Sequence, residues 1–291
     1  MKQAVFLVAH GAPERIEDVE SYLSYVRGGR PGNPKVLEEV RHRFGAIGGC
    51  SPLLKWTRTQ AEALEKVLGI PVFFGMRNWH PFIRETMERI RDAGIERLAG
   101  ICLAPQFSEL SIGLYMKRTD EACRELGVTA EIRWAKSYHT ESLLIEAFAE
   151  RLRPVADGAK VLFTAHSLPE KALANGDPYA DECRATAAAV AAAAGLAHFD
   201  FAFQSQGMTE DRWLGPTVES CLDGYAADGV RSVVLDPIGF VCDHVEILYD
   251  IDIQFREYAA GRGMELRRPE SLNGSPAFTA ALAEVAKGCL Q

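Results

Sequence analysis

The chain has 291 residues and a formal net charge of −8, with 47% apolar residues. Its length suffices for two domains of roughly 100–200 residues each. The acidic balance argues against a nucleic-acid partner, because phosphate binding requires clustered Lys and Arg.

Neither a membrane span nor a disulfide framework is indicated. No apolar run approaches the roughly 20 residues that a span needs, and Met1 leads almost directly into a predicted strand instead of a signal peptide. The seven cysteines are scattered and include no C-x-x-C pair, which is typical of reduced thiols. We therefore expect a cytoplasmic protein without a transmembrane segment.

Two apolar runs that lie 156 residues apart end in similar motifs. Residues 4–9, AVFLVA, lead into A-H-G-A-P-E, and residues 160–165, KVLFTA, lead into A-H-S-L-P-E. Short continuous runs of this kind are typical of buried parallel strands. Each predicted strand ends at a histidine, His10 or His166, so the two halves of the chain look alike.

The likeness continues along both halves, where strand-like runs alternate with helical segments. Further strands are predicted at 72–76, 98–103, 131–135, 199–203, 233–235 and 264–267. Helices are predicted from Pro81 and Pro216 onward and over 141–152, 181–194 and 276–290. Strands that alternate with helices form parallel sheets covered on both faces.

This pattern predicts an α/β protein with two similar Rossmann-like, doubly wound domains. We place the N-terminal domain at 1–140 and the C-terminal domain at 141–291, joined near 136–158, with the last helix able to pack across. Ligands bind outside the carboxyl ends of the strands in such sheets. We therefore expect an inter-domain cleft that includes His10, His166 and the segments 204–207 and 239–246.

The segment 231–255 opens as a strand, breaks at Pro237 and Gly239, and then predicts a helix from about Cys242. Four polar residues share one face of that α-helix, and the other faces are apolar: Asp243, Glu246, Asp250 and Gln254. Because an unpaired buried charge costs several kcal/mol, a buried stripe needs a cation, a basic partner or a polar cavity. A solvated face with Asp243 as the N-cap explains the pattern equally well.

His166 gives the stripe a possible partner. A neutral imidazole with nearby carboxylates suits a weakly held first-row divalent metal, and suits a proton-acceptor relay equally. The chain lacks H-E-x-x-H and the P-loop motif, which disfavours a tight zinc site and a nucleotide enzyme.

The segment 20–57 is long for a connection after the first strand. It carries aromatic and aliphatic residues together with Arg27, Arg30 and Arg43. Such a segment could cover a flat apolar ligand whose carboxylates meet the arginines. A surface helical hairpin with solvated charges is the alternative interpretation.

Together, six motifs resemble the ferrochelatase family, the enzymes that insert ferrous iron into a porphyrin at the end of haem synthesis. They occur in the family's order and span nearly the whole chain: I-G-G-C-S-P-L (47–53), L-A-P-Q-F-S (103–108), F-T-A-H-S-L-P-E (163–170), G-D-P-Y (176–179), W-L-G-P (213–216) and D-P-I-G-F-V-C-D-H-V-E-I-L-Y-D (236–250). The family fold, two Rossmann-like domains with the porphyrin in the cleft, agrees with the repeat.

The resemblance implies that His166 and Glu246 are the active-site pair, which binds the entering iron or accepts the pyrrole protons. Asp250 and Gln254 match the family's acidic helix ridge, a suggested path for metal or protons. Gln254 stands where a Glu is often found, which weakens the case for a second metal site.

The short soluble enzymes of the coproporphyrin branch are the most similar. Y-V-R-G-G-R-P (25–31) resembles their Arg-rich propionate-binding segment. Implied porphyrin contacts are His10, Arg27, Arg43, Phe44, Ser51, Tyr115 and Trp213. Two of these differ from that branch, because His10 stands at the position of a Tyr that can ligate product iron and Phe44 replaces a second Tyr. The motif R-N-W-H-P-F (77–82) is closer to the protoporphyrin branch.

We therefore expect a monomeric ferrochelatase that takes ferrous iron and a porphyrin, coproporphyrin III or protoporphyrin IX, as substrates. No permanently bound cofactor is expected, and Cys289 alone does not reproduce the four cysteines of a [2Fe–2S] cluster. A sirohydrochlorin cobalt or nickel chelatase is one alternative, although such enzymes typically have a second histidine where this chain has Glu246. A non-catalytic tetrapyrrole carrier is the other.

Overall fold

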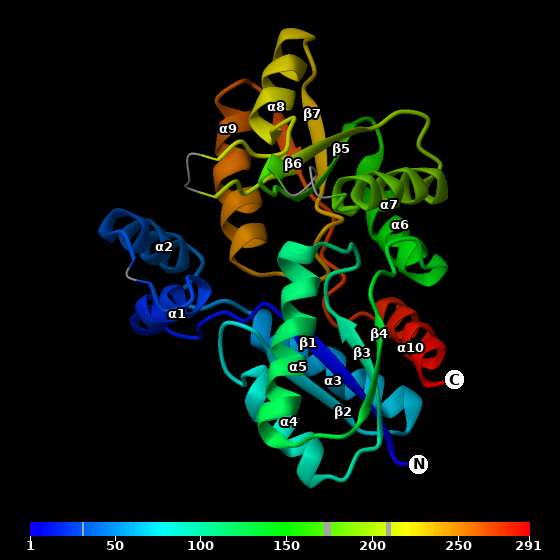
Figure 1. Ribbon diagram of the computed structural model, residues 1–291. Coiled ribbons are helices and arrows are strands. Elements are labelled where there is room, and N and C mark those ends of the chain that lie inside the picture. The colour runs from blue at the N-terminus through cyan, green and yellow to red at the C-terminus, as the bar shows by residue number, and fades with distance from the viewer. Residues whose placement is uncertain (31, 172–175, 208–210) are drawn as a thin grey trace. The chain divides into compact units, whose positions relative to one another are not determined.

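The computed structural model describes residues 1–30, 32–171, 176–207 and 211–291. They form two compact units, each with its own parallel sheet (Figure 1). The first unit comprises Met1–Tyr138 and Asn273–Gln291, and the second comprises His139–Leu272.

Four parallel strands form the sheet of the first unit, in the spatial order β2-β1-β3-β4. These are β1 (Gln3–Ala9), β2 (Val72–Met76), β3 (Arg97–Cys102) and β4 (Glu131–Ala135). The helices are α1 (Val19–Val26), α2 (Pro34–Ala46), α3 (Leu53–Leu68), α4 (Ile83–Asp92), α5 (Leu114–Leu126), which follows the π-helical turn η2 (Glu109–Gly113), and α10 (Pro276–Leu290).

The central strand β1 carries apolar side chains on both faces, as a strand buried in a parallel sheet does. Phe6 and Val8 pack in one cluster with Met87 of α4 and Tyr115 of α5. The helices α3 and α10 contact each other, and α10 also contacts β3. The sheet is therefore covered by helices from both ends of the sequence.

The second unit repeats this arrangement with the strand order β6-β5-β7-β8. Its strands are β5 (Lys160–His166), β6 (Asp200–Gln204), β7 (Ser232–Asp236) and β8 (Glu265–Arg267), all parallel. The helices are α6 (Ser142–Ala156), α7 (Tyr179–Ala194), α8 (Val218–Ala227) and the π-helix η4 (Glu246–Phe255), which continues as α9 (Arg256–Ala260).

These two helix-covered parallel sheets confirm the predicted α/β class. The predicted C-terminal domain, 141–291, included the terminal segment Asn273–Gln291, with its last helix able to pack across. The first unit comprises Met1–Tyr138 together with that segment. The reason is that Phe278, Leu282 and Ala286 recur every four residues on α10 and are buried as that helix packs on α3 and β3. The predicted cleft between the domains stays a prediction, since the two units are described separately.

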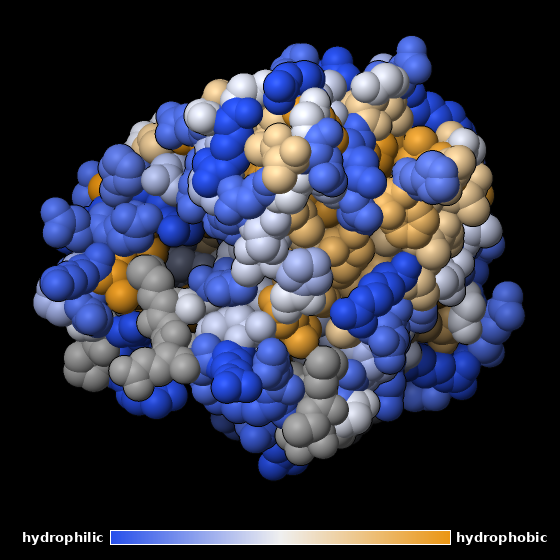
Figure 2. All heavy atoms as spheres, turned by 90° about the horizontal axis from the view of Figure 1, so that it is seen from above, coloured by the Kyte–Doolittle hydropathy of each residue, from blue (hydrophilic) through white to orange (hydrophobic). Residues whose placement is uncertain are grey.

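The surface mixes hydrophilic residues with smaller apolar patches on the face that Figure 2 shows. The exposed large apolar side chains come from separate elements: Met1, Tyr25, Val67, Leu110 and Leu143. Isolated apolar residues of this kind are normal on a protein surface. Within the described residues, no helix combines the length and hydropathy required to cross a membrane.

Candidate active site

The turn after β7 brings a helix against the end of β5. Pro237 and Gly239 end the strand, and the Gly239 backbone N–H donates to the carbonyl of Thr164 at 3.3 Å. A Cβ added at Gly239 would lie only 2.8 Å from the Cβ of Ala165, so the close approach requires glycine. The chain then enters η4 beside His166, the last residue of β5.

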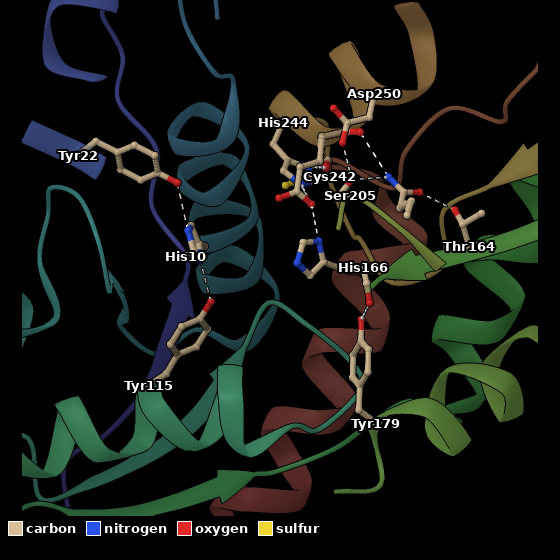
Figure 3. Close-up of polar contacts among 12 residues, drawn as sticks. His10, Tyr22, Tyr115, Thr164, His166, Tyr179, Ser205, Cys242, His244 and Asp250 are labelled. Carbon is tan, nitrogen blue, oxygen red and sulfur yellow. Dashed lines mark hydrogen bonds and ion pairs between the residues drawn. The ribbon is translucent and has the colours of Figure 1, made fainter. Parts of the chain in front are cut away.

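His166 and Glu246 form a direct contact at this strand end (Figure 3). His166 Nδ1 lies 3.0 Å from Glu246 Oε2, and each side chain keeps about a third of its surface exposed, 33% and 32%. From behind, the buried Tyr179 hydroxyl donates to the His166 carbonyl oxygen at 2.9 Å. Glu246 therefore holds the imidazole and Tyr179 holds the backbone of the same residue, while a third of the His166 side chain stays exposed.

A second histidine, His244, lies on the other side of Glu246, with Nε2 4.0 Å from Oε2. Burial lowers the pKa of His244, and Glu246 only partly offsets this. Burial also acts to lower the pKa of His166, but the nearby charges of Glu246 and Asp250 outweigh it, so the net shift is upward. Of the two imidazoles, His166 is the stronger base.

The helix that carries Glu246 differs from the predicted one. It is a π-helix that begins at Glu246, and Asp243 lies before it. Asp243 accepts a hydrogen bond from Ser271 at 2.7 Å and pairs with Arg268 at 3.2 Å, so its placement on the polar stripe was wrong. Arg268, in the loop after β8, binds Asp243 at a position before the helix begins.

In a π-helix the hydrogen bonds run from i to i+5, so residues four or five apart lie nearly above one another. Ile247, Ile251 and Phe255 accordingly recur on the buried face and pack in the core of the second unit. Glu246 and Asp250 have the same spacing, and Asp250 is only 2% exposed. Gln254, the last residue predicted for the ridge, is exposed to solvent.

The other strand-end histidine, His10, follows β1 in the first unit. Its Nε2 lies 3.1 Å from the Tyr22 hydroxyl and its Nδ1 lies 3.5 Å from the Tyr115 hydroxyl (Figure 3). The amide nitrogen of Asn78 lies 3.2 Å from Nε2 and 3.3 Å from Nδ1. Half-buried Arg77 lies over the Tyr115 ring at 5.8 Å.

Comparison with known proteins identifies the family. A family model described as Ferrochelatase matches residues 2–289. The chain belongs to the ferrochelatase family. Ferrochelatases are metal chelatases that insert iron into porphyrin, so the prediction of a metal chelatase of haem biosynthesis is confirmed.

Relatives match over nearly their full length. A Ferrochelatase from Acidobacterium capsulatum is 45% identical, with 99% of this chain and 95% of the relative covered. A Coproporphyrin III ferrochelatase from Bacillus pumilus is 35% identical, with 98% and 96% covered.

Solved structures of other chelatases share the fold. The sirohydrochlorin chelatase SirB from Bacillus subtilis subspecies spizizenii, in complex with cobalt, has a TM-score of 0.62 at 13% identity and covers 99% of this chain and 95% of its own. CbiX, described as the terminal enzyme for biosynthesis of siroheme in denitrifying bacteria, has a TM-score of 0.53 at 15% identity, with 99% and 100% covered. At these identities the likeness supports the fold alone.

The segment 20–57 of this ferrochelatase consists mainly of the contacting helices α1 and α2 and the start of α3. Arg27 caps the C-terminus of α1 and is half-buried, and Arg43 pairs with Glu39 at 2.8 Å. Pro31, the last residue of the Arg-rich motif, lies outside the described residues.

The remaining predicted porphyrin contacts differ in accessibility. Phe44 is 1% exposed and Ser51 is 4% exposed, where the Ser51 hydroxyl accepts from the Leu53 N–H at the start of α3. Tyr115 is 5% exposed, although its hydroxyl reaches His10. Trp213, in the second unit, is half-buried, and its backbone forms a bridge with Pro169. Phe44 is thus an interior residue in this conformation.

The described part of the chain contains no group of three or more His, Cys, Asp or Glu side chains arranged to hold a metal. His166 and Glu246 form a pair of such side chains, and His244 Nε2 lies 4.0 Å from the Glu246 carboxylate. All seven cysteines are free thiols.

Two contacts near His166 were not predicted from the sequence, namely those of the Tyr179 and Thr164 side chains. Tyr179 belongs to the G-D-P-Y motif, which gave no indication that its side chain would return to β5. The expectation that ligands bind at strand ends did select Gln204 and Ser205, which contact η4.

Proposed function

We propose that His166 and Glu246 remove the pyrrole protons while this ferrochelatase inserts ferrous iron into its porphyrin. The observation that carries the proposal is the 3.0 Å contact between His166 Nδ1 and Glu246 Oε2 at a partly exposed strand end. A base must lie within hydrogen-bond reach of the proton that it accepts, and its pKa must favour uptake. The raised pKa of His166 meets the second condition.

The reaction releases two protons for each iron that enters, so charge is conserved when Fe²⁺ replaces them. Neutral His166 accepts the two protons one after the other at Nε2 and releases the first to solvent before it takes the second. In each protonated state its Nδ1–H points at the Glu246 carboxylate, which stabilises the imidazolium. Asp250, one turn along η4, adds a second negative charge next to this path. Gln254 extends the same stripe toward solvent as a neutral group.

The same pair could contact the entering iron, because a neutral imidazole and a carboxylate are both ligands for first-row divalent metals. A single imidazole nitrogen cannot bind a proton and a metal together, so iron and protons compete for it. The proposal is that proton removal is the main role. Loss of His166 is then expected to lower kcat much more than it raises the KM for iron.

We propose coproporphyrin III as the preferred porphyrin. Relatives named Coproporphyrin III ferrochelatase are 35% and 36% identical over 97–98% of this chain, which supports this choice. The Arg-rich end of α1 supports it as well, because coproporphyrin carries more carboxylates than protoporphyrin and arginine binds carboxylates in a bidentate manner. The alternative is protoporphyrin IX. Monomeric state and cytoplasmic location remain predictions.

The test is anaerobic ferrous iron insertion by the purified protein, with coproporphyrin III and protoporphyrin IX in parallel. The expected result is a higher kcat/KM for coproporphyrin III. Arg27→Ala should lower that value about tenfold and affect protoporphyrin IX less, consistent with loss of a charge-assisted hydrogen bond of about 1.4 kcal/mol. Arg41→Ala, which removes a cation paired with Glu20 at 3.2 Å, is the matched control.

Three other outcomes contradict parts of the proposal. Faster turnover of protoporphyrin IX would assign the chain to the other branch. Equal losses for both porphyrins in Arg27→Ala would exclude Arg27 as a contact of the additional carboxylates. Binding of both porphyrins without insertion would leave the carrier alternative in place.

A further inference from the structure

A chain of hydrogen bonds runs beside the His166–Glu246 pair in the second unit (Figure 3). Thr164 Oγ1 lies 2.6 Å from Gln204 Oε1, and Gln204 Nε2 lies 3.3 Å from Ser205 Oγ. The Ser205 hydroxyl in turn contacts Asp250 Oδ2. Thr164, Gln204 and Asp250 are at most 2% exposed, so water has little access to these contacts.

The chemistry of these groups fixes the direction of the chain. Gln204 Nε2 also lies 3.4 Å from the backbone carbonyl oxygen of Glu246, which can only accept. A flipped Gln204 amide would place two acceptors against each other there, so Nε2 must face Glu246 and Oε1 must face the Thr164 hydroxyl. Ser205 accepts from Gln204 and therefore gives its single hydrogen to Asp250.

The backbone at Ser205 supports a specific role for its side chain. Ser205 has φ = 58°, in the left-handed region that residues other than glycine seldom adopt. Such a conformation is strained and persists where surrounding contacts enforce it. Here it follows β6 directly and directs the hydroxyl toward η4.

We propose that Thr164, Gln204 and Ser205 are positioning residues that hold the acidic face of η4 in its working geometry. Gln204 anchors the Glu246 backbone, and Ser205 fixes the Asp250 carboxylate, so that the Glu246 side chain stays within hydrogen-bond distance of His166. Catalytic groups need placement to within about 0.5 Å, which supporting hydrogen bonds supply. The inference rests on the proposed roles of His166 and Glu246, because the chain acts through them.

Thr164 offers the most specific test, because its hydroxyl bonds Gln204 and neither η4 nor His166. A loss of activity in a Thr164 variant would therefore be transmitted through Gln204. Thr164→Val removes the hydroxyl and keeps the shape, whereas Thr164→Ser keeps the hydroxyl. In anaerobic iron insertion by the full chain, Thr164→Val should lower kcat about tenfold with the porphyrin KM within about twofold, and Thr164→Ser should retain wild-type kcat. Thr57→Val is the matched control, because Thr57 is also fully buried and donates one 2.9 Å hydrogen bond, to the Leu53 carbonyl.

Ser205→Gly provides an independent variant in case Thr164→Val does not fold. Glycine adopts φ = 58° readily, so this change removes the hydroxyl without adding backbone strain. We expect Ser205→Gly and Ser205→Ala to lose kcat to a similar extent, about tenfold, with the porphyrin KM unchanged.

The outcomes separate this inference from the proposed function. Wild-type kcat in folded Thr164→Val or in Ser205→Gly would overturn the inference, and so would an equal loss in Thr164→Ser. His166→Ala is measured alongside. If His166→Ala inserts iron at the normal rate, the proposed function fails. If His166→Ala is inactive while Thr164→Val and Ser205→Gly are fully active, only the positioning role of Thr164, Gln204 and Ser205 is rejected.

Discussion

The ends of the two central strands, β1 and β5, show how one structural position can hold two different sites. An Ala-His pair lies at the end of each strand, where His10 directly follows β1 and His166 is the last residue of β5. The Nδ1 atom of His10 faces the Tyr115 hydroxyl at 3.5 Å, and the Nδ1 atom of His166 faces the Glu246 carboxylate at 3.0 Å. A neutral hydroxyl in one unit thus takes the place of a charged carboxylate in the other.

Equivalent elements supply these two partners. The third strand of the first unit, β3, leads to the π-helical turn η2 and then to α5, which carries Tyr115. Its counterpart β7 leads to the π-helix η4, which carries Glu246. The repeated fold therefore sets where the histidine and its neighbour lie, and the type of neighbouring side chain sets the chemistry.

The largest effect is expected from Glu246→Gln, which gives His166 a neutral neighbour as His10 has. We expect kcat to fall by about 10²–10³, because the imidazolium loses its stabilising charge. Glu246 raises the pKa of His166, so its removal lowers that pKa. The base form then persists to lower pH, and the acidic limb of the kcat/KM profile should shift downward.

The control for that change is Glu85→Gln. Glu85 Oε1 lies 2.9 Å from His80 Nδ1, a similar contact between two exposed side chains. The Glu85→Gln variant should keep the wild-type kcat and the wild-type pH profile of kcat/KM. If the acidic limb of the kcat/KM profile stays at the same pH in Glu246→Gln, the protonation of His166 does not determine that limb.

The last residues of the third strands offer a second contrast, Cys102 on β3 and Asp236 on β7, both buried. Burial raises the pKa of both groups, and that of Asp236 reaches about 8 despite nearby Arg268. Asp236 Oδ2 has no hydrogen-bond partner among the residues that the structure describes. Burial therefore favours the neutral form at both positions, although only Asp236 carries a carboxyl group.

Asp236→Asn should accordingly stabilise the protein at alkaline pH. A carboxyl whose pKa is higher in the folded state contributes stability at low pH that is lost as pH rises, here from about 4 through about 8. The variant lacks this pH-dependent loss, so the increase in its free energy of unfolding relative to wild type should be several kcal/mol larger at pH 9 than at pH 5.

Urea unfolding at both pH values measures this effect. Asp200→Asn is the control of opposite sign, because hydrogen bonds from Tyr225 and Lys160 lower the pKa of Asp200 and that variant should be destabilised at neutral pH. A gain in Asp236→Asn that is equal at pH 5 and pH 9 would contradict a raised pKa.

A smaller effect is expected at the carbonyl oxygens of the two histidines. The His166 carbonyl accepts from the Tyr179 side chain at 2.9 Å, whereas the His10 carbonyl accepts from the Asn78 backbone N–H at 2.9 Å. Tyr179→Phe should lower the free energy of unfolding by about 1 kcal/mol and kcat by a few-fold. Thermal unfolding and insertion assays would detect both, and an unchanged kcat would limit Tyr179 to a structural role.

The sequence predicted the strands well because their cause is local. Apolar runs ending at His10 and His166 predict two equivalent buried strands, and the motif order predicts the family. Glu246 was selected from the sequence by both the polar stripe and the resemblance, and its catalytic role stays a prediction.

The interactions around that residue depend on contacts between distant segments. Asp243 lies before the helix because it pairs with Arg268, which is distant in the sequence. The π-helical spacing of η4 cannot be recognised in a pattern that assumes 3.6 residues per turn. The left-handed backbone conformation of Ser205 could not be predicted from the sequence either, because glycine is the residue that usually marks such a position.

The most direct test of the difference between the two strand ends is anaerobic ferrous iron insertion by His166→Ala and His10→Ala, with porphyrin binding measured for both. We predict that His166→Ala loses insertion by at least about 10²-fold while it still binds porphyrin, and that His10→Ala keeps kcat within about tenfold. Near-normal turnover by His166→Ala, or a greater loss in His10→Ala, would contradict the assignment of proton removal to the second unit.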